Sequence, residues 1–229
     1  MNKSLMQIRT STLLFFVLSV GACTSSRPES LPYDAWQLSF GVPDYMEVWI
    51  ETAAVIDIND QAFGDVGGGV PAYTYPRPSS KGAPAHFKGN PKGWPQHPGG
   101  KGQHIIGAAL PMWIYVRWQS MAEPQTYEAY IKVPQSMRDT MLKGEKTYCG
   151  ADGKWITDYR ENVIVGLAPG GIAKVWLGGQ CLRSTEALRV KGRIHPKGPN
   201  GGPPKGKYRP LQEESKAYVE KFGIPYESW

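Results

Sequence analysis

Apolar and polar residues alternate along much of this chain, and a period of two indicates β-strands rather than helices. The stretch 45–58 illustrates the pattern, because Met46, Val48 and Ile50 fall on one face and Glu47 and Trp49 on the other. Strands are expected at 36–40, 45–58, 112–118, 126–133, 163–167, 172–177 and 186–194. The sequence therefore predicts about six to eight strands, most of them in antiparallel pairs.

Two pairs of these strands are expected to form hairpins. Glu123-Pro124 marks a turn between 112–118 and 126–133, and Ala168-Pro169-Gly170-Gly171 marks another between 163–167 and 172–177. Consecutive hairpins argue against a doubly wound parallel sheet, in which strands alternate with helices. The expected fold class is mainly β, an antiparallel sandwich-like single domain with long glycine- and proline-rich loops.

Two helices complete the predicted elements. A short helix is expected near 135–143, because proline is favoured at its start and glycine just after its end. A C-terminal helix is expected from Pro210, with Glu213 and Glu214 in its first turn and Gly223 after its end. Leu211, Tyr218 and Phe222 should share the helix face that packs on the sheet. The stretch 143–158 is interpreted as a polar connection.

The stretch 64–107 lacks the alternating pattern and is expected to be a long loop rich in glycine and proline. A loop of this length inside a domain is usually functional or disordered. Three of the four histidines lie in it, His86, His97 and His104, but their spacing matches no metal-ligand pattern. No metal site is therefore assigned.

The N-terminus has the pattern of a secretory signal. Lys3 and Arg9 precede the apolar block 13–20, which is too short for a permanent membrane span. The block ends in Gly21-Ala22-Cys23, which resembles the lipobox of bacterial lipoproteins. This resemblance implies lipidation of Cys23; a plain signal peptide with a chance cysteine is the alternative.

The expected organisation follows from that cleavage point. Residues 1–22 form a lipoprotein signal peptide, 23–31 a tether, and 32–229 a single β-rich globular domain. Thr24 stands where an aspartate retains many such lipoproteins in the inner membrane, so an outer-membrane anchor facing the periplasm is expected. Loss of Lys3 and Arg9 lowers the formal net charge from +6 to +4, an excess that a solvated basic surface explains. Nucleic acid is not an expected partner in this compartment.

The two remaining cysteines, Cys149 and Cys181, are predicted to form a disulfide in an oxidising compartment. Two free buried thiols are one alternative and a metal pair is another. A metal pair is disfavoured because neither cysteine has a histidine or second cysteine at ligand spacing.

Motifs for catalysis are missing from the sequence. It has no nucleophile elbow, phosphate-binding loop, zinc motif or calcium loop. Carboxylates gather along one segment, at Asp44, Glu47, Glu51, Asp57, Asp60 and Asp65. A glycosidase pair among them, with a tryptophan such as Trp49 or Trp94 stacking on sugar, stays an alternative. No catalytic residue and no cofactor is assigned.

Several longer motifs resemble one family of bacterial lipoproteins. They are 43–52 (PDYMEVWIET), 114–120 with 123–127 (IYVRWQS, EPQTY), 166–171 (GLAPGG) and the closing 223–229 (GIPYESW). The family is the one catalogued as domain of unknown function 2931, and the resemblance covers nearly the whole mature chain. It implies a lipid-anchored envelope protein and carries over no catalytic residues. More loosely, small lipoproteins of this kind are similar to immunity proteins that neutralise lipase effectors of type VI secretion.

Three hypotheses for function follow. The first is an outer-membrane lipoprotein that acts by binding, with a secreted effector as partner if it is an immunity protein. The second is a structural or assembly factor of the envelope without catalytic activity. The third is an enzyme of carbohydrate or lipid metabolism, which requires carboxylates or histidines converging in a polar cleft. The sequence does not identify the partner, the loop that contacts it or the oligomeric state.

Overall fold

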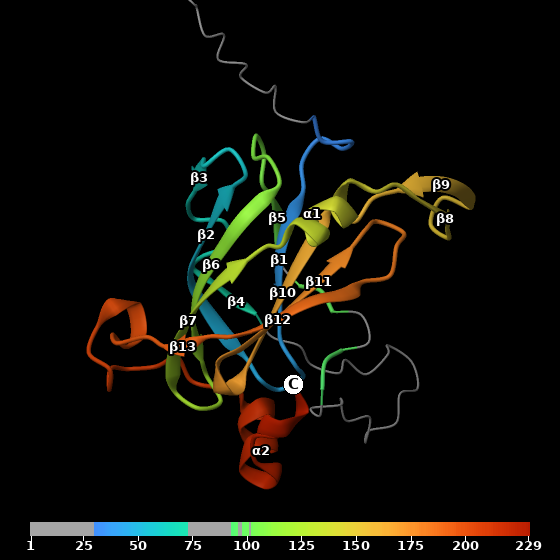
Figure 1. Ribbon diagram of the computed structural model, residues 1–229. Helices are drawn as coiled ribbons and strands as arrows, with labels where there is room; N and C mark the ends of the chain where they lie inside the picture. The colour runs from blue at the N-terminus through green and yellow to red at the C-terminus, as the bar shows by residue number, and fades with distance from the viewer. Residues whose placement is uncertain (1–29, 73–92, 96–97, 101) are drawn as a thin grey trace, which may run out of the picture.

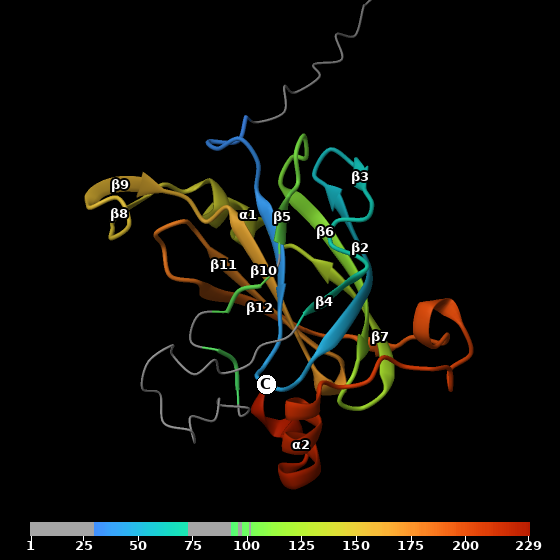
Figure 2. The ribbon, with the colours of Figure 1, turned by 180° about the vertical axis from the view of Figure 1, so that it is seen from behind.

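The computed structural model describes residues 30–72, 93–95, 98–100 and 102–229, and it consists mainly of two β-sheets (Figures 1 and 2). Sheet A has the order β12-β11-β10-β1-β5, with β12 Thr185–Lys191, β11 Ile172–Gly178, β10 Asn162–Ala168, β1 Gln37–Gly41 and β5 Gly102–His104. Sheet B has the order β13-β7-β6-β2-β3, with β13 Arg193–Ile194, β7 Gln125–Lys132, β6 Pro111–Ser120, β2 Val48–Asp57 and β3 Ala62–Phe63. Strand β4, Val70–Ala72, also pairs with β2. Mainly β architecture is thus confirmed.

The two sheets bury one continuous apolar core between them. Trp36, Leu38 and Phe40 supply it from the start of sheet A, and each is at most 2% exposed. Val48 and Ile50 supply it from β2, so the alternation seen in the sequence marks the inward face. Antiparallel pairing prevails, as expected, but β1 and β10 pair in parallel, with Leu38 opposite Val163.

Both predicted hairpins are present. Strands β6 and β7 pair from Trp113–Lys132 to Ser120–Gln125, and β10 and β11 pair across the single-turn 3-10 helix η1, Pro169–Gly171. Gly170 within η1 has φ +74°, a conformation that favours glycine. Its N–H donates to the Glu123 carboxylate at 2.6 Å, which ties the second turn to the first.

Two sequence expectations for local structure need correction. The stretch 143–158 is not a plain connection, because it forms a separate two-stranded sheet of β8, Glu145–Cys149, and β9, Lys154–Asp158. The stretch 64–107 contains β4 and β5, which add short strands to sheets B and A. Its residues 73–92, 96–97 and 101 lie outside the described part of the chain.

The predicted helices form near their expected positions, as α1, Gln135–Leu142, and α2, Glu213–Phe222. Helix α2 starts three residues later than Pro210, and Phe222 is 53% exposed rather than packed on the sheet. The contacts come instead from Tyr218, which stacks on Tyr45 at 4.5 Å, and from Ser215, which is fully buried. Two further 3-10 turns are η2, Pro199–Gly201, and η3, Tyr226–Ser228.

The ends of the described chain lie at opposite ends of the sandwich. Residue 30 leads into β1 at one end, while α2 and the C-terminus lie at the other (Figures 1 and 2). Strand β2 runs between them, from the C-terminal end at Val48 to the N-terminal end at Asp57. None of the helices in the described segments is long and apolar enough to span a membrane.

Candidate functional site

The outward face of sheet B carries side chains in cross-strand rows that the strand register sets. One row contains Thr52, Arg117, Glu128 and Arg193, because these residues are paired across β2, β6, β7 and β13. The next row toward the N-terminal end places Ala54 beside Tyr115 and Tyr130, and the last places Ile56 beside Trp113 and Lys132. The face therefore changes from charged to aromatic along its length.

The charged half is held by ion pairs. Glu51, whose side chain is 2% exposed, contacts the Arg117 guanidinium at 2.7 Å and accepts a hydrogen bond from Gln119 at 2.8 Å. Glu128, 4% exposed, contacts Arg193 at 2.8 Å. These ion pairs fix the positions of both enclosed carboxylates on the sheet.

The chain itself covers this charged half with its segment 195–212. The backbone N–H of Asn200 donates to Glu51 at 2.6 Å, and the Arg209 guanidinium lies 3.3 Å from the centre of the Trp49 ring. At the edge, the backbone N–H of Gln212 donates to Glu47 at 3.1 Å. Polar residues on this face thus serve to fasten the C-terminal segment across the sheet.

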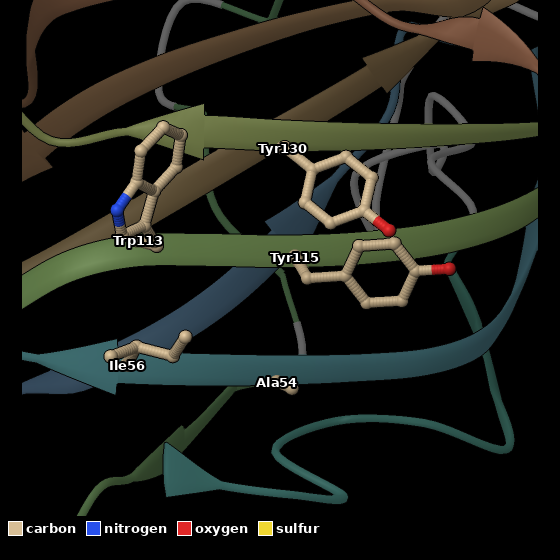
Figure 3. Close-up of a pocket in the computed structure, with 5 residues that line it drawn as sticks. All are labelled: Ala54, Ile56, Trp113, Tyr115 and Tyr130. Atoms are coloured by element: carbon tan, nitrogen blue, oxygen red, sulfur yellow. The ribbon is translucent and has the colours of Figure 1, made fainter. Parts of the chain in front are cut away.

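The aromatic half is left open to solvent among the described residues. It surrounds an apolar hollow of about 520 Å³ lined by Ala54, Ile56, Trp113, Tyr115 and Tyr130 (Figure 3). We call these five residues the aromatic platform. The rings of Tyr115 and Tyr130 lie 4.8 Å apart, and Figure 3 shows all five side chains on the same side of the sheet. Large apolar groups on an outward sheet face are typical of a binding surface.

Charged groups border the platform. The Lys132 ammonium lies 5.8 Å from the centre of the Trp113 ring, and the Arg193 guanidinium lies 5.8 Å from that of Tyr130. The Tyr115 hydroxyl donates to Glu128 at 3.1 Å. Burial, and next this hydrogen bond, raise the pKa of Tyr115 to about 12, so the phenol stays a neutral donor at physiological pH.

A second, more polar hollow lies at the N-terminal end of sheet A. It is lined by Tyr33, Asp34, Ala35, His104, Ile106 and Glu161, with a volume of about 500 Å³. Burial, and next the nearby Asp158, raise the pKa of Glu161, while His104 opposes that shift. Its lining thus contains side chains that can exchange protons, namely Asp34, His104 and Glu161. Among the lining side chains, the only hydroxyl is the phenol of Tyr33.

The structure places the candidate residues from the sequence as follows. Cys23, His86 and His97 lie outside the described residues, and His104 is exposed on β5. Across the described ranges, no three His, Cys, Asp or Glu side chains are placed to hold a metal ion. Cys149 and Cys181 form a disulfide with Cα atoms 5.1 Å apart.

The carboxylates gathered along 44–65 do not converge on either hollow. Asp57 is fully buried and accepts hydrogen bonds from the backbone N–H groups of Asn59, Gln61 and Ala109, which fixes the turn from β2 to β3. Glu47 accepts from Ser215 at 2.5 Å and so anchors α2. The two tryptophans considered for sugar stacking are also engaged, since Trp49 lies under Arg209 and Trp94 packs on Trp176 at 4.9 Å.

The aromatic platform was not predicted from the sequence, although the sequence contains a signal for it. Trp113, Tyr115 and Tyr130 alternate with the buried residues of their strands, so they fall on the face expected to meet solvent. Three large aromatic side chains at such positions are unusual for a sheet face that serves only solubility. Their grouping, however, depends on the register between β6 and β7.

Comparison with known proteins identifies the family but no individual relative. No curated protein and no solved structure matches this chain. One family model does match, over residues 22–227, and this range spans every strand and α-helix described above. The chain therefore belongs to the family described as protein of unknown function DUF2931.

Proposed function

We propose that this protein is a lipoprotein, anchored through Cys23 to the outer membrane on its periplasmic side, that acts by binding a protein partner at the aromatic platform. The observation that carries the proposal is the open apolar hollow on a sheet face whose other half the chain covers itself. The lipobox resemblance at residues 20–23 supports the anchor.

A protein partner suits the chemistry of the platform. Tryptophan and tyrosine are the residues that most often dominate binding energy at protein interfaces, and arginine joins them. Trp113 and Tyr130 occupy the open surface, with Arg193 and Lys132 at its border. This is the arrangement of an interface with an apolar centre and a charged rim.

The specific form of the proposal is an immunity protein that neutralises a secreted lipase effector of the type VI system. An inhibitor needs a complementary surface and no reactive group, which agrees with a platform lined by Ala, Ile, Trp and Tyr side chains. The family resemblance supplies the expectation of a lipid-anchored envelope protein.

The test is protection from an effector encoded beside this gene. Deletion of the gene should make cells sensitive to the effector, and the wild-type gene should restore protection. Trp113→Ala and Tyr130→Ala together should remove protection, because they delete two of the three aromatic side chains of the platform. Phe222→Ala is the matched control, since the Phe222 ring is 53% exposed, close to the 56% of Tyr130, but belongs to α2 at the other end of the molecule.

Two results would contradict the proposal at different levels. If the platform variant protects as well as the wild type while folding normally, the contact surface lies elsewhere. If deletion leaves cells insensitive to the effector but permeable to large antibiotics, the protein is an envelope assembly factor and not an immunity protein.

A further inference from the structure

Exposed apolar side chains gather at the end of the molecule where residue 30 enters the fold. Trp155 is 71% exposed, Tyr148 53% and Ile106 81%. Ile106 lines the polar hollow together with Tyr33 and Asp34, so it lies beside the first described residues of the chain. Side chains of this kind in solvent indicate a surface that meets something apolar.

Trp155 and Tyr148 belong to the two-stranded β8–β9 unit, which projects from the body at this end (Figures 1 and 2). They are direct cross-strand partners, and their rings are 5.9 Å apart in an edge-to-face arrangement. The base of the unit adjoins the start of the chain, because Tyr159 and Tyr33 are in edge contact at 5.8 Å.

The β8–β9 unit is held firmly although it buries little apolar surface. The disulfide joins Cys149 to Cys181, and the backbone N–H of Cys181 donates to Asp158 at 2.7 Å. At its base, Arg160 contacts Glu145 at 2.6 Å and also donates to the backbone carbonyl of Leu177 in sheet A. The aromatic pair is therefore presented on a fixed support, not on a mobile loop.

We infer that the β8–β9 unit lies against the phospholipid surface, with Tyr148 and Trp155 at the level of the lipid headgroups. The inference rests on the proposed lipid anchor at Cys23. Seven residue steps separate Cys23 from residue 30, a reach of roughly 25 Å at most. A five-residue strand spans about 17 Å, which is less than this reach, so the tether is long enough to let the end of the unit contact the bilayer.

The side chains match this environment. Tryptophan and tyrosine concentrate at membrane–water interfaces, where an apolar ring with one polar group is favoured. Exposed lysines lie close to the pair in the sequence: Lys146 is on the same face of β8 as Tyr148, Lys154 precedes Trp155, and Lys143 precedes β8. Asp152 is in the turn between the two strands. Lysines near a surface that contains anionic lipid are attracted to it.

The test uses residues 24–229 with a hexahistidine tag in place of Cys23, held on vesicles that contain a nickel-chelating lipid. This chain retains every residue that the structure describes. The vesicles contain phosphatidylethanolamine and phosphatidylglycerol, part of it with brominated acyl chains that quench nearby tryptophan fluorescence. Because the tag replaces the lipid, the result does not depend on lipidation of Cys23 or on the aromatic platform.

We expect quenching in the wild-type protein, and Trp155→Phe should remove more than half of the quenched signal. Trp49→Phe is the control and should leave quenching unchanged, because Trp49 lies at the far end of β2. Lys146→Glu with Lys154→Glu should reduce quenching at least twofold in vesicles rich in phosphatidylglycerol. An unquenched wild-type protein overturns the inference, and so does quenching that Trp113→Phe removes and Trp155→Phe does not.

Discussion

At the scale of single residues, the charged half of sheet B depends on the pair of Glu51 and Arg117. The Glu51 side chain is almost fully buried, whereas that of Arg117 is 23% exposed. Removal of the arginine alone leaves a carboxylate in a poorly solvated place, where hydrogen bonds from Gln119 and Asn200 are its remaining contacts within the described part of the chain. The pair therefore has a structural role: it holds Glu51 in place, and Glu51 in turn binds the backbone of the C-terminal segment at Asn200.

Arg117→Ala should lower the free energy of unfolding by about 3 kcal/mol, as is usual when one partner of a buried ion pair is removed. Urea unfolding followed by circular dichroism measures this loss. Lys174→Ala is the control, since its partner Glu186 is half exposed and the loss should stay below about 1 kcal/mol. Equal losses in the two variants would show that burial does not distinguish the pairs.

The raised pKa of Tyr115 predicts how the free energy of unfolding depends on pH. Its pKa is about 12 in the folded protein, mainly because of burial, against about 10 for an ordinary tyrosine. Between these values the unfolded chain releases a proton that the folded protein keeps, so the free energy of unfolding falls as pH rises from about 10 to 12. Tyr115→Phe should make this fall shallower in urea titrations, and superimposable curves would contradict the assignment.

At the scale of elements, the β8–β9 unit is held in position by the Cys149–Cys181 disulfide and the Arg160–Glu145 ion pair. Cys149→Ala with Cys181→Ala should lower the free energy of unfolding by about 3–4 kcal/mol, from the unfolded-state entropy of the loop. Amide hydrogen exchange should speed up most in β8 and β9. If β8 and β9 remain as protected as in the wild type, the disulfide does not hold the unit.

The same unit explains what the sequence could and could not predict. Strands with one buried face, such as β2 and β7, follow from alternation because each inward side chain is apolar. Strands β8 and β9 differ, because their less exposed face includes the polar Glu145 and Thr147. Their exposed face includes the aromatic Tyr148 and Trp155, so burial no longer follows the alternation of apolar and polar residues.

Local sequence patterns also could not predict the contacts between distant segments. The parallel pairing of Leu38 with Val163 joins β1 to a strand more than a hundred residues later, and no turn motif in the sequence predicts this pairing. The aromatic platform likewise requires the register that puts Tyr115 beside Tyr130. The sequence indicated which faces are buried, and the structure decides what meets on the outward face.

At the scale of the whole molecule, the two ends of the sandwich differ in role. The N-terminal end carries the start of the chain, the β8–β9 unit and the last platform row of Ile56 and Trp113. The C-terminal end carries α2 and Trp229, whose backbone carbonyl accepts a hydrogen bond from Arg189. A partner on the platform would therefore bind close to the end that the proposed anchor would hold.

The proposed anchor makes its own prediction. Cys23→Ala should stop lipidation and leave either unprocessed precursor or a product missing from the outer membrane, because no acyl chains are then available for insertion. Metabolic labelling with a palmitate analogue, followed by membrane fractionation, measures both effects. Unchanged labelling and normal outer-membrane fractionation of the variant would contradict the anchor.

The central claim is that the aromatic platform is the surface that binds a protein partner. Its most direct measurement is photo-cross-linking in intact cells, with benzoylphenylalanine placed at Tyr130 or, as the control, at Phe222. We predict one discrete cross-linked protein from position 130, none from position 222, and loss of the adduct when Trp113→Ala is added. No adduct at position 130, or the same adduct from both positions, would contradict the claim.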